Sequence, residues 1–169
     1  MSDGFEGGDF ERAVARVSAE PSPRALAERL GIDWDHLSRL ALDAAALVLV
    51  GREERRGEVV SYTGEAFTAG FLIGLHLLEE PRAVPERLGP AVDAVQARGR
   101  HAVIADHCDL ASVAQLETLY SEALLESMEP TPPEPDALRA PVTRAFETGL
   151  AVGVELGSGG ADRAGTEQT

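Results

Sequence analysis

The chain contains no lysine and no asparagine, and it has only one cysteine and 5% aromatic residues. A single cysteine excludes a disulfide framework within the chain and a zinc site built from cysteines. Aromatic side chains are few, whereas alanine and leucine dominate the apolar residues. This combination favours closely packed helices over a β-sandwich.

Positive charge is also scarce. Fifteen arginines oppose 29 acidic residues, which gives a formal net charge of -14. The codons of lysine and asparagine both begin with two adenines, so their joint absence indicates a GC-rich genome. High negative charge keeps proteins soluble, and halophiles use it despite the self-repulsion that it causes. The composition therefore predicts a protein of a salt-adapted organism, with another very GC-rich organism as the alternative. In a salt-adapted organism the acidity would reflect the solvent more than a partner.

Long apolar runs are missing too. The most apolar stretch, residues 66–78, contains two glycines, a threonine and a histidine, and it falls short of the roughly 20 residues that a membrane span needs. The segment from Met1 to Asp9 is acidic and lacks the apolar centre of a signal peptide. We therefore expect a cytoplasmic protein without a membrane partner.

Hydrophobic periodicity and helix-ending residues predict a mainly α fold. The expected helices cover residues 10–19, 24–30, a stretch opening at Asp33, 63–80, 86–97, a stretch opening at Asp109, and 138–156. Residues 103–105 fit either a helix or a short buried strand. Four prolines make residues 129–136 a stiff linker, and residues 157–169 are expected to form a disordered tail.

One stretch departs from the helical pattern. Two β-branched runs, 48–50 and 59–62, flank a charged turn bounded by Gly51 and Gly57. Such runs around a glycine-flanked turn are typical of a β-hairpin. A helix that continues to Arg56 is the alternative that periodicity leaves open.

Residues 66–74 and 145–153 repeat one another. Each segment places Phe, Gly, a bulky apolar residue and Gly on one helical face; the residues are Phe67, Gly70, Phe71, Gly74, Phe146, Gly149, Leu150 and Gly153. Glycine costs about 1 kcal/mol relative to alanine inside a helix, so close approach of another helix is expected to offset it. The faces predict packing in the monomer core or a dimer seam, with a ligand groove as a third alternative. Their flanking residues do not repeat, so the sequence does not support duplication of the whole domain.

Residues 22–63 carry a helix-turn-helix pattern. Ala27 allows two helices to cross closely, Gly31 makes the turn, and Leu37 fixes the second helix on the first. The stretch resembles a winged helix-turn-helix DNA-binding domain, with the expected hairpin at the position of the wing. The resemblance implies a winged-helix-like unit at residues 1–63, a helical assembly region at 64–156, and a homodimer on double-stranded DNA.

The resemblance also implies a set of five DNA-contacting residues, two on the groove-reading helix and three at the tip of the wing. They are His36, Arg39, Arg52, Arg55 and Arg56. Residues 22–63 contain six arginines and seven acids, a net charge of -1 out of the total of -14. A stretch relieved of negative charge is what contact with phosphate requires.

Reactive side chains gather at one place, between Asp106 and Asp109, with His101 nearby. The spacing of His101 and His107 is not that of a helical metal-binding pair, and Asp109 is expected to cap a helix. We therefore expect no catalytic residue, no metal and no cofactor. The sequence predicts a non-enzymatic DNA-binding regulator that dimerises through its glycine-bearing helices. A helical adaptor for another protein is the alternative, and an enzyme using residues 106–108 is the third.

Overall fold

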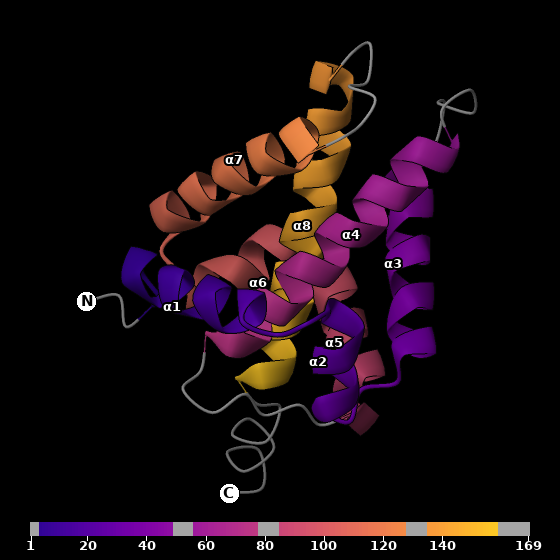
Figure 1. Cartoon of the computed structure of the whole chain (residues 1–169). Helices are drawn as coiled ribbons and strands as arrows, with labels where there is room; N and C mark the ends of the chain where they lie inside the picture. Colours follow the sequence, from indigo (N-terminus) through magenta and orange to yellow (C-terminus); the bar gives the residue numbers. More distant parts are fainter. Residues whose placement is uncertain (1–3, 49–55, 78–84, 128–134, 159–169) are drawn as a thin grey trace, which may run out of the picture.

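The computed structural model describes residues 4–48, 56–77, 85–127 and 135–158 (Figure 1). This part of the chain is almost entirely helical and has no strand beyond an isolated bridge between Phe5 and Cys108. The elements are α1 (Gly7–Ser18), α2 (Pro23–Arg29), α3 (Trp34–Val48), α4 (Arg56–His76), the 3-10 turn η2 (Pro85–Arg87), α5 (Leu88–Arg98), α6 (Arg100–His107), α7 (Leu110–Ser127) and α8 (Pro135–Gly157). The mainly helical fold class is therefore confirmed. Within these residues, no helix combines the length and apolarity needed to cross a membrane.

Local sequence explains several helix boundaries. The carboxylate of Asp33 accepts a hydrogen bond from the Asp35 N–H at 3.0 Å where α3 begins. Asp109 accepts one from the Ser112 N–H at 3.1 Å where α7 begins. Both N-caps predicted from the sequence are thus confirmed. Gly31, with φ of 77°, adopts a conformation that disfavours other residues and turns the chain between α2 and α3.

The hairpin expected over residues 48–62 is wrong where the structure describes it. Val48 ends α3, and residues 56–62, which include the expected second strand, belong to α4. Residues 49–55 lie outside the described residues. The β-branched Val59 and Val60 do not prevent a helix, because intrinsic propensity is weak beside tertiary packing. Farther along the same helix, one face of α4 is buried against α8, and this packing favours the helix.

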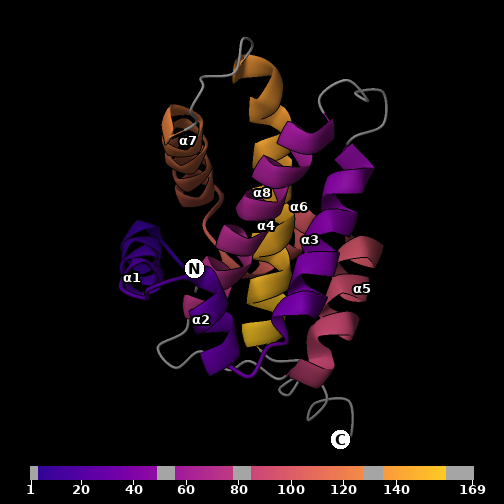
Figure 2. The ribbon, with the colours of Figure 1, turned by 45° about the vertical axis from the view of Figure 1, so that its right-hand side comes forward.

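The pair α4 and α8 forms the centre of the molecule, and the other helices surround it (Figures 1 and 2). Gly70 faces the backbone of Phe146 and Leu150. One turn later, Gly74 faces the backbone of Leu150 and Val154. Because the contacts advance along both helices together, α4 and α8 run in the same direction.

The contact between the two helices is reciprocal. A Cβ on Gly70 would meet the carbonyl oxygen of Phe146, and a Cβ on Gly149 would meet that of Phe67. Phe67 and Phe146 hold matching positions in the two repeated segments. The two helices are therefore related by an approximate two-fold axis between them.

This two-fold relation extends beyond the central pair. Each half of the chain has two short helices followed by two longer ones, α1 to α4 and then α5 to α8. Their buried residues correspond as well; Phe10 and Ala13 match Leu88 and Ala91, and Leu26 and Ala27 match Val103 and Ile104. The structure thus indicates an internal repeat of the whole four-helix unit. Outside the glycine segments the halves share a burial pattern but little residue identity, which is why the sequence alone does not support duplication.

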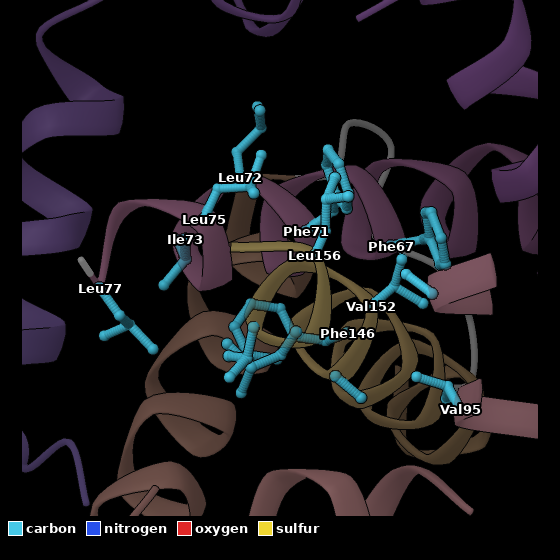
Figure 3. Close-up of a cluster of buried hydrophobic side chains, with 14 of the residues drawn as sticks. Phe67, Phe71, Leu72, Ile73, Leu75, Leu77, Val95, Phe146, Val152 and Leu156 are labelled. Atoms are coloured by element: carbon cyan, nitrogen blue, oxygen red, sulfur yellow. The ribbon is translucent and has the colours of Figure 1, made fainter. Parts of the chain in front are cut away.

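One hydrophobic cluster joins both halves. Phe67 and Phe71 from α4 and Phe146 and Val152 from α8 are at most 2% exposed (Figure 3). Tyr120 of α7 stacks on Phe146 with a ring-centroid distance of 4.7 Å. The core therefore includes side chains from both halves of the chain.

The domain boundaries expected from the sequence fall differently on the helices. The boundary after residue 63 lies inside α4, and Pro135 and Asp136 of the expected linker begin α8. Gly157, assigned to the tail, ends α8. The remainder of the linker and the tail, residues 129–134 and 159–169, lies outside the described residues.

Candidate functional site

The structure places two of the five expected DNA-contacting residues on α3. His36 is half-buried and Arg39 is exposed, with its Nε donating to the carbonyl oxygen of Asp35 at 3.3 Å. Arg52 and Arg55 lie outside the described residues. Arg56 begins α4, but its side chain is also outside the described part. The five residues are therefore not shown as one basic surface.

The two helices of the expected helix-turn-helix are present as α2 and α3. Leu26, Ala27, Ile32 and Leu37 are at most 2% exposed, so the turn packs its apolar residues into the core. Residues 56–62, where the resemblance implied the second strand of a wing, belong to the helix α4. The described residues therefore show two consecutive helices followed by a third, and they do not show a winged-helix unit.

The eight residues of the repeated glycine faces lie at the contact between α4 and α8. A Cβ on any of the four glycines would come closer than 3.0 Å to backbone atoms of the opposite helix. The four bulky residues of these faces, Phe67, Phe71, Phe146 and Leu150, are at most 2% exposed. The two faces therefore cover one another within a single chain.

The reactive side chains near the end of α6 have separate partners. Asp106 forms an ion pair with Arg98, and the Nε2 atom of His107 lies 3.7 Å from a carboxylate oxygen of Glu155. Cys108 is 5% exposed, and burial raises the pKa of its thiol to about 12. A thiol with this pKa is a poor nucleophile at neutral pH. Among the described residues, no group of three His, Cys, Asp or Glu side chains is placed to hold a metal ion.

A polar cluster that the sequence analysis missed lies between α6, α7 and α8. Glu147 is 8% exposed, and its Oε2 atom accepts a hydrogen bond from Arg100 Nε at 3.0 Å and lies 2.5 Å from His101 Nε2. Burial, and then the nearby charge of Glu147, raises the pKa of Glu117 to about 7, with Arg100 acting in the opposite direction. The feature of the sequence that could have revealed this cluster is Glu147, a charged residue beside the apolar face of α8.

An apolar groove follows α4, and we call it the α4 groove. It consists of two adjoining cavities of about 590 and 690 Å³ that share Val17, Ala69 and Tyr120 in their walls. Along α4 the walls extend from Ser61 to Ile73, which at 1.5 Å per residue is about 18 Å. Burial raises the pKa of the Tyr120 hydroxyl at the junction of the two cavities, so this phenol stays neutral.

Two exposed leucines stand on opposite walls of the α4 groove. Leu119 on α7 is 66% exposed and Leu42 on α3 is 49% exposed, and these helices lie on either side of α4 (Figures 1 and 2). Trp34, the only tryptophan in the chain, lines the same cavity as Leu42. Large apolar side chains that face solvent beside an apolar groove mark a contact surface.

Acidic side chains border the α4 groove. Glu11 of α1 and Glu65 of α4 line it, while Arg24, the basic residue in its wall, donates from Nε to Glu28 at 3.0 Å. Helix α7, which forms one wall, contains three glutamates and no basic residue. The groove is therefore apolar inside and negative around its edge.

Comparison with models of protein families, with curated proteins and with solved structures gives no match for this chain. The class that the structure defines is an all-helical internal repeat, within the described residues, that carries an open apolar groove.

Proposed function

We propose that the protein is a non-catalytic adaptor that binds an amphipathic helix of a partner protein in the α4 groove. The observation that carries this proposal is the pair of adjoining cavities flanked by the exposed Leu42 and Leu119. Grooves between helices recognise partner helices by taking in apolar residues at i, i+4 and i+7. Burial of exposed leucines provides the hydrophobic contribution to binding.

The length of the groove agrees with a helical ligand. About 18 Å along α4 corresponds to about 12 residues of helix, or a little over three turns. The cavity that contains Ile73 takes one end of such a helix, and the cavity that contains Trp34 takes the other. Tyr120 lies between them, where a central apolar side chain of the ligand would pack.

The acidic side chains around the groove favour a basic outer face on the partner. Glu11 and Glu65 are in its walls, and Glu122 and Glu126 are exposed on α7. A helix with arginine or lysine beside its apolar stripe would meet these carboxylates, and such complementarity contributes to orientation and association rate. The partner segment is therefore basic and amphipathic.

Binding to double-stranded DNA remains a prediction that depends on the winged-helix resemblance. The residues expected to form its second wing strand are helical. On the outer side of α3, Arg39 stands between Asp35 and Asp43, one turn away in each direction, and all three are exposed. Two carboxylates beside one guanidinium disfavour phosphate contact. These observations favour the adaptor over the DNA-binding regulator.

A labelled peptide tests the proposal. The probe is a helical peptide of about 16 residues with leucines at i, i+4 and i+7 and arginines on the flanks, and binding is followed by fluorescence anisotropy. We expect Leu119→Glu to weaken binding by about tenfold or more, because it places a charge at an apolar contact. The control is Leu110→Glu, which alters another exposed leucine of α7 that is not in the wall of the groove; it should change the affinity less than about twofold.

Equal effects of the two substitutions would reject the α4 groove as the binding site. Absence of binding by the unmodified protein would reject a basic amphipathic helix as its ligand. Sedimentation velocity tests whether a second copy of the chain occupies the groove. A dimer that dissociates on Leu119→Glu but not on Leu110→Glu would overturn the adaptor proposal and assign the groove to self-association.

A further inference from the structure

The internal repeat creates a second cavity, of about 470 Å³, on the other side of the central helix pair. It lies among α3, α5 and α8, which correspond to α7, α1 and α4 around one part of the α4 groove. Val92 and Val95 occupy the places of Val14 and Val17. The two cavities are therefore equivalent positions in the two halves of the molecule.

The second cavity differs from the α4 groove in charge. Arg144 of α8 stands where α4 has Glu65, and Thr148 stands where α4 has Ala69. The floor remains apolar, with Phe67, Val95 and Val152 at most 4% exposed. The cavity therefore combines an apolar floor with polar and basic groups, an arrangement that small organic ligands require.

Two arginines supply the basic groups. Arg100 lines the cavity, and its Nε is held by the buried Glu147 at 3.0 Å, which limits the orientations of the guanidinium. Arg144 is exposed and forms no ion pair with any residue that the structure describes. The acid in the wall is the exposed Asp43. A guanidinium is well suited to a carboxylate because its N–H donors match both carboxylate oxygens.

The start of α6 adds to the same positive region. Gly99 lines the cavity and is the N-cap of α6, where no side chain caps the first turn. The free N–H groups of a helix N-terminus carry a partial positive charge. Together with Arg100 and Arg144, this helix end favours an anionic group at the edge of the apolar floor.

We infer that the second cavity binds a small amphipathic carboxylate, with its apolar body on Phe67, Val95 and Val152 and its carboxylate at Arg100 and Arg144. An acyl or aryl chain of about eight carbons is a suitable size for a cavity in the usual range for small ligands. This site is separate from the α4 groove and does not depend on the proposed adaptor function.

Calorimetric titration with octanoate and with 1-octanol tests the inference. Octanoate should bind at least about tenfold more tightly than octanol, because the alcohol lacks the charge that the arginines recognise. Arg144→Gln should weaken octanoate binding by about tenfold. Arg139→Gln is the matched control, since it removes an exposed guanidinium from the same helix outside the cavity, and it should leave the affinity within about twofold.

A second substitution and a second probe complete the test. Gln96 is an exposed residue of the cavity wall, so Gln96→Glu should also weaken octanoate binding without disturbing the core. Octanoate binding should persist in Leu119→Glu and should leave the fluorescence of Trp34 unchanged, because both residues belong to the α4 groove. Equal affinity for octanol, or no loss with Arg144→Gln and Gln96→Glu, would overturn the proposal. A Trp34 response to octanoate would assign the ligand to the α4 groove instead.

Discussion

Gly70 is the residue whose substitution tests the central helix contact most simply. A Cβ at this position would meet the carbonyl oxygen of Phe146 and come within 2.9 Å of the Leu150 nitrogen. Because these are backbone atoms, the two helices would have to separate. We expect Gly70→Ala to lower the free energy of unfolding by about 3 kcal/mol, measured by chemical denaturation.

Gly64 on the same helix provides the control. No heavy atom lies within 4 Å of a Cβ built at Gly64, so Gly64→Ala should raise the free energy of unfolding by about 1 kcal/mol through helix propensity alone. If both substitutions stabilise the protein, the packing of α4 on α8 described here is wrong.

Glu117 should make stability depend on pH. Burial, followed by the charge of Glu147, raises its pKa from 4.5 to about 7 in the folded protein. The folded state therefore holds this proton more tightly than the unfolded state, and the free energy of unfolding decreases as the pH rises from about 4.5 through 7. Glu117→Gln should remove about 1 kcal/mol of this decrease, a value reduced for the solvent screening of a half-buried carboxyl.

Unfolding curves at pH 5 and pH 8 measure this effect. Glu122→Gln is the control on the same helix, because Glu122 is exposed and pairs only at 3.8 Å with Arg139. Glu122→Gln should leave the difference in the free energy of unfolding between pH 5 and pH 8 nearly unchanged. Identical pH dependence in the Glu117→Gln variant and the unmodified protein would contradict the burial of this carboxyl.

At the residue scale, short-range signals could be predicted from the sequence and long-range ones could not. Asp33 and Asp109 were identifiable as N-caps because capping depends on residues only a few positions apart. The association of Glu147 with Arg100 joins residues 47 positions apart. No local pattern specifies such a pair, and only the packing of α6 on α8 brings the two side chains together.

At the scale of helices, α4 and α8 should be the most stable elements and α7 one of the less stable long ones. Residues 70–76 of α4 are buried without exception, whereas α7 buries only Val113, Ser121 and Leu125 among its 18 residues. Amide protection follows such burial. Hydrogen exchange should therefore be slowest in the second half of α4 and in α8, and clearly faster in α7. Equal protection of α7 and α4 would contradict this order of helix stability.

The missed elements show where sequence patterns are ambiguous. The valines at 59 and 60 fit a strand by residue type, but the buried face of α4 continues at Thr63, Ala66 and Phe67, which fits a helix. Tertiary burial decides between these readings, and it involves α8, which lies far along the chain. The internal repeat was missed for a related reason. Each half preserves which positions are buried, while the residue types at most of them have changed.

At the scale of the whole molecule, the two halves keep one framework and differ in the cavities that it creates. The α4 groove is apolar with acidic edges, whereas the equivalent cavity of the second half carries Arg100 and Arg144. Pro23 and Thr68 line the Trp34 cavity, and the corresponding residues of the second half, Arg100 and Glu147, form an ion pair. The two halves therefore share the arrangement of their helices, whereas the residues that differ at equivalent positions give the two proposed binding sites different charges.

Trp34 allows the central claim to be measured directly. As the only tryptophan, in the wall of the α4 groove, it reports on that groove without a label. Addition of the basic amphipathic peptide should shift its emission to shorter wavelength with saturation, and Leu119→Glu should move the midpoint to about tenfold higher peptide concentration. Saturable peptide binding by anisotropy with no change in Trp34 emission would contradict the assignment of the α4 groove as the partner site.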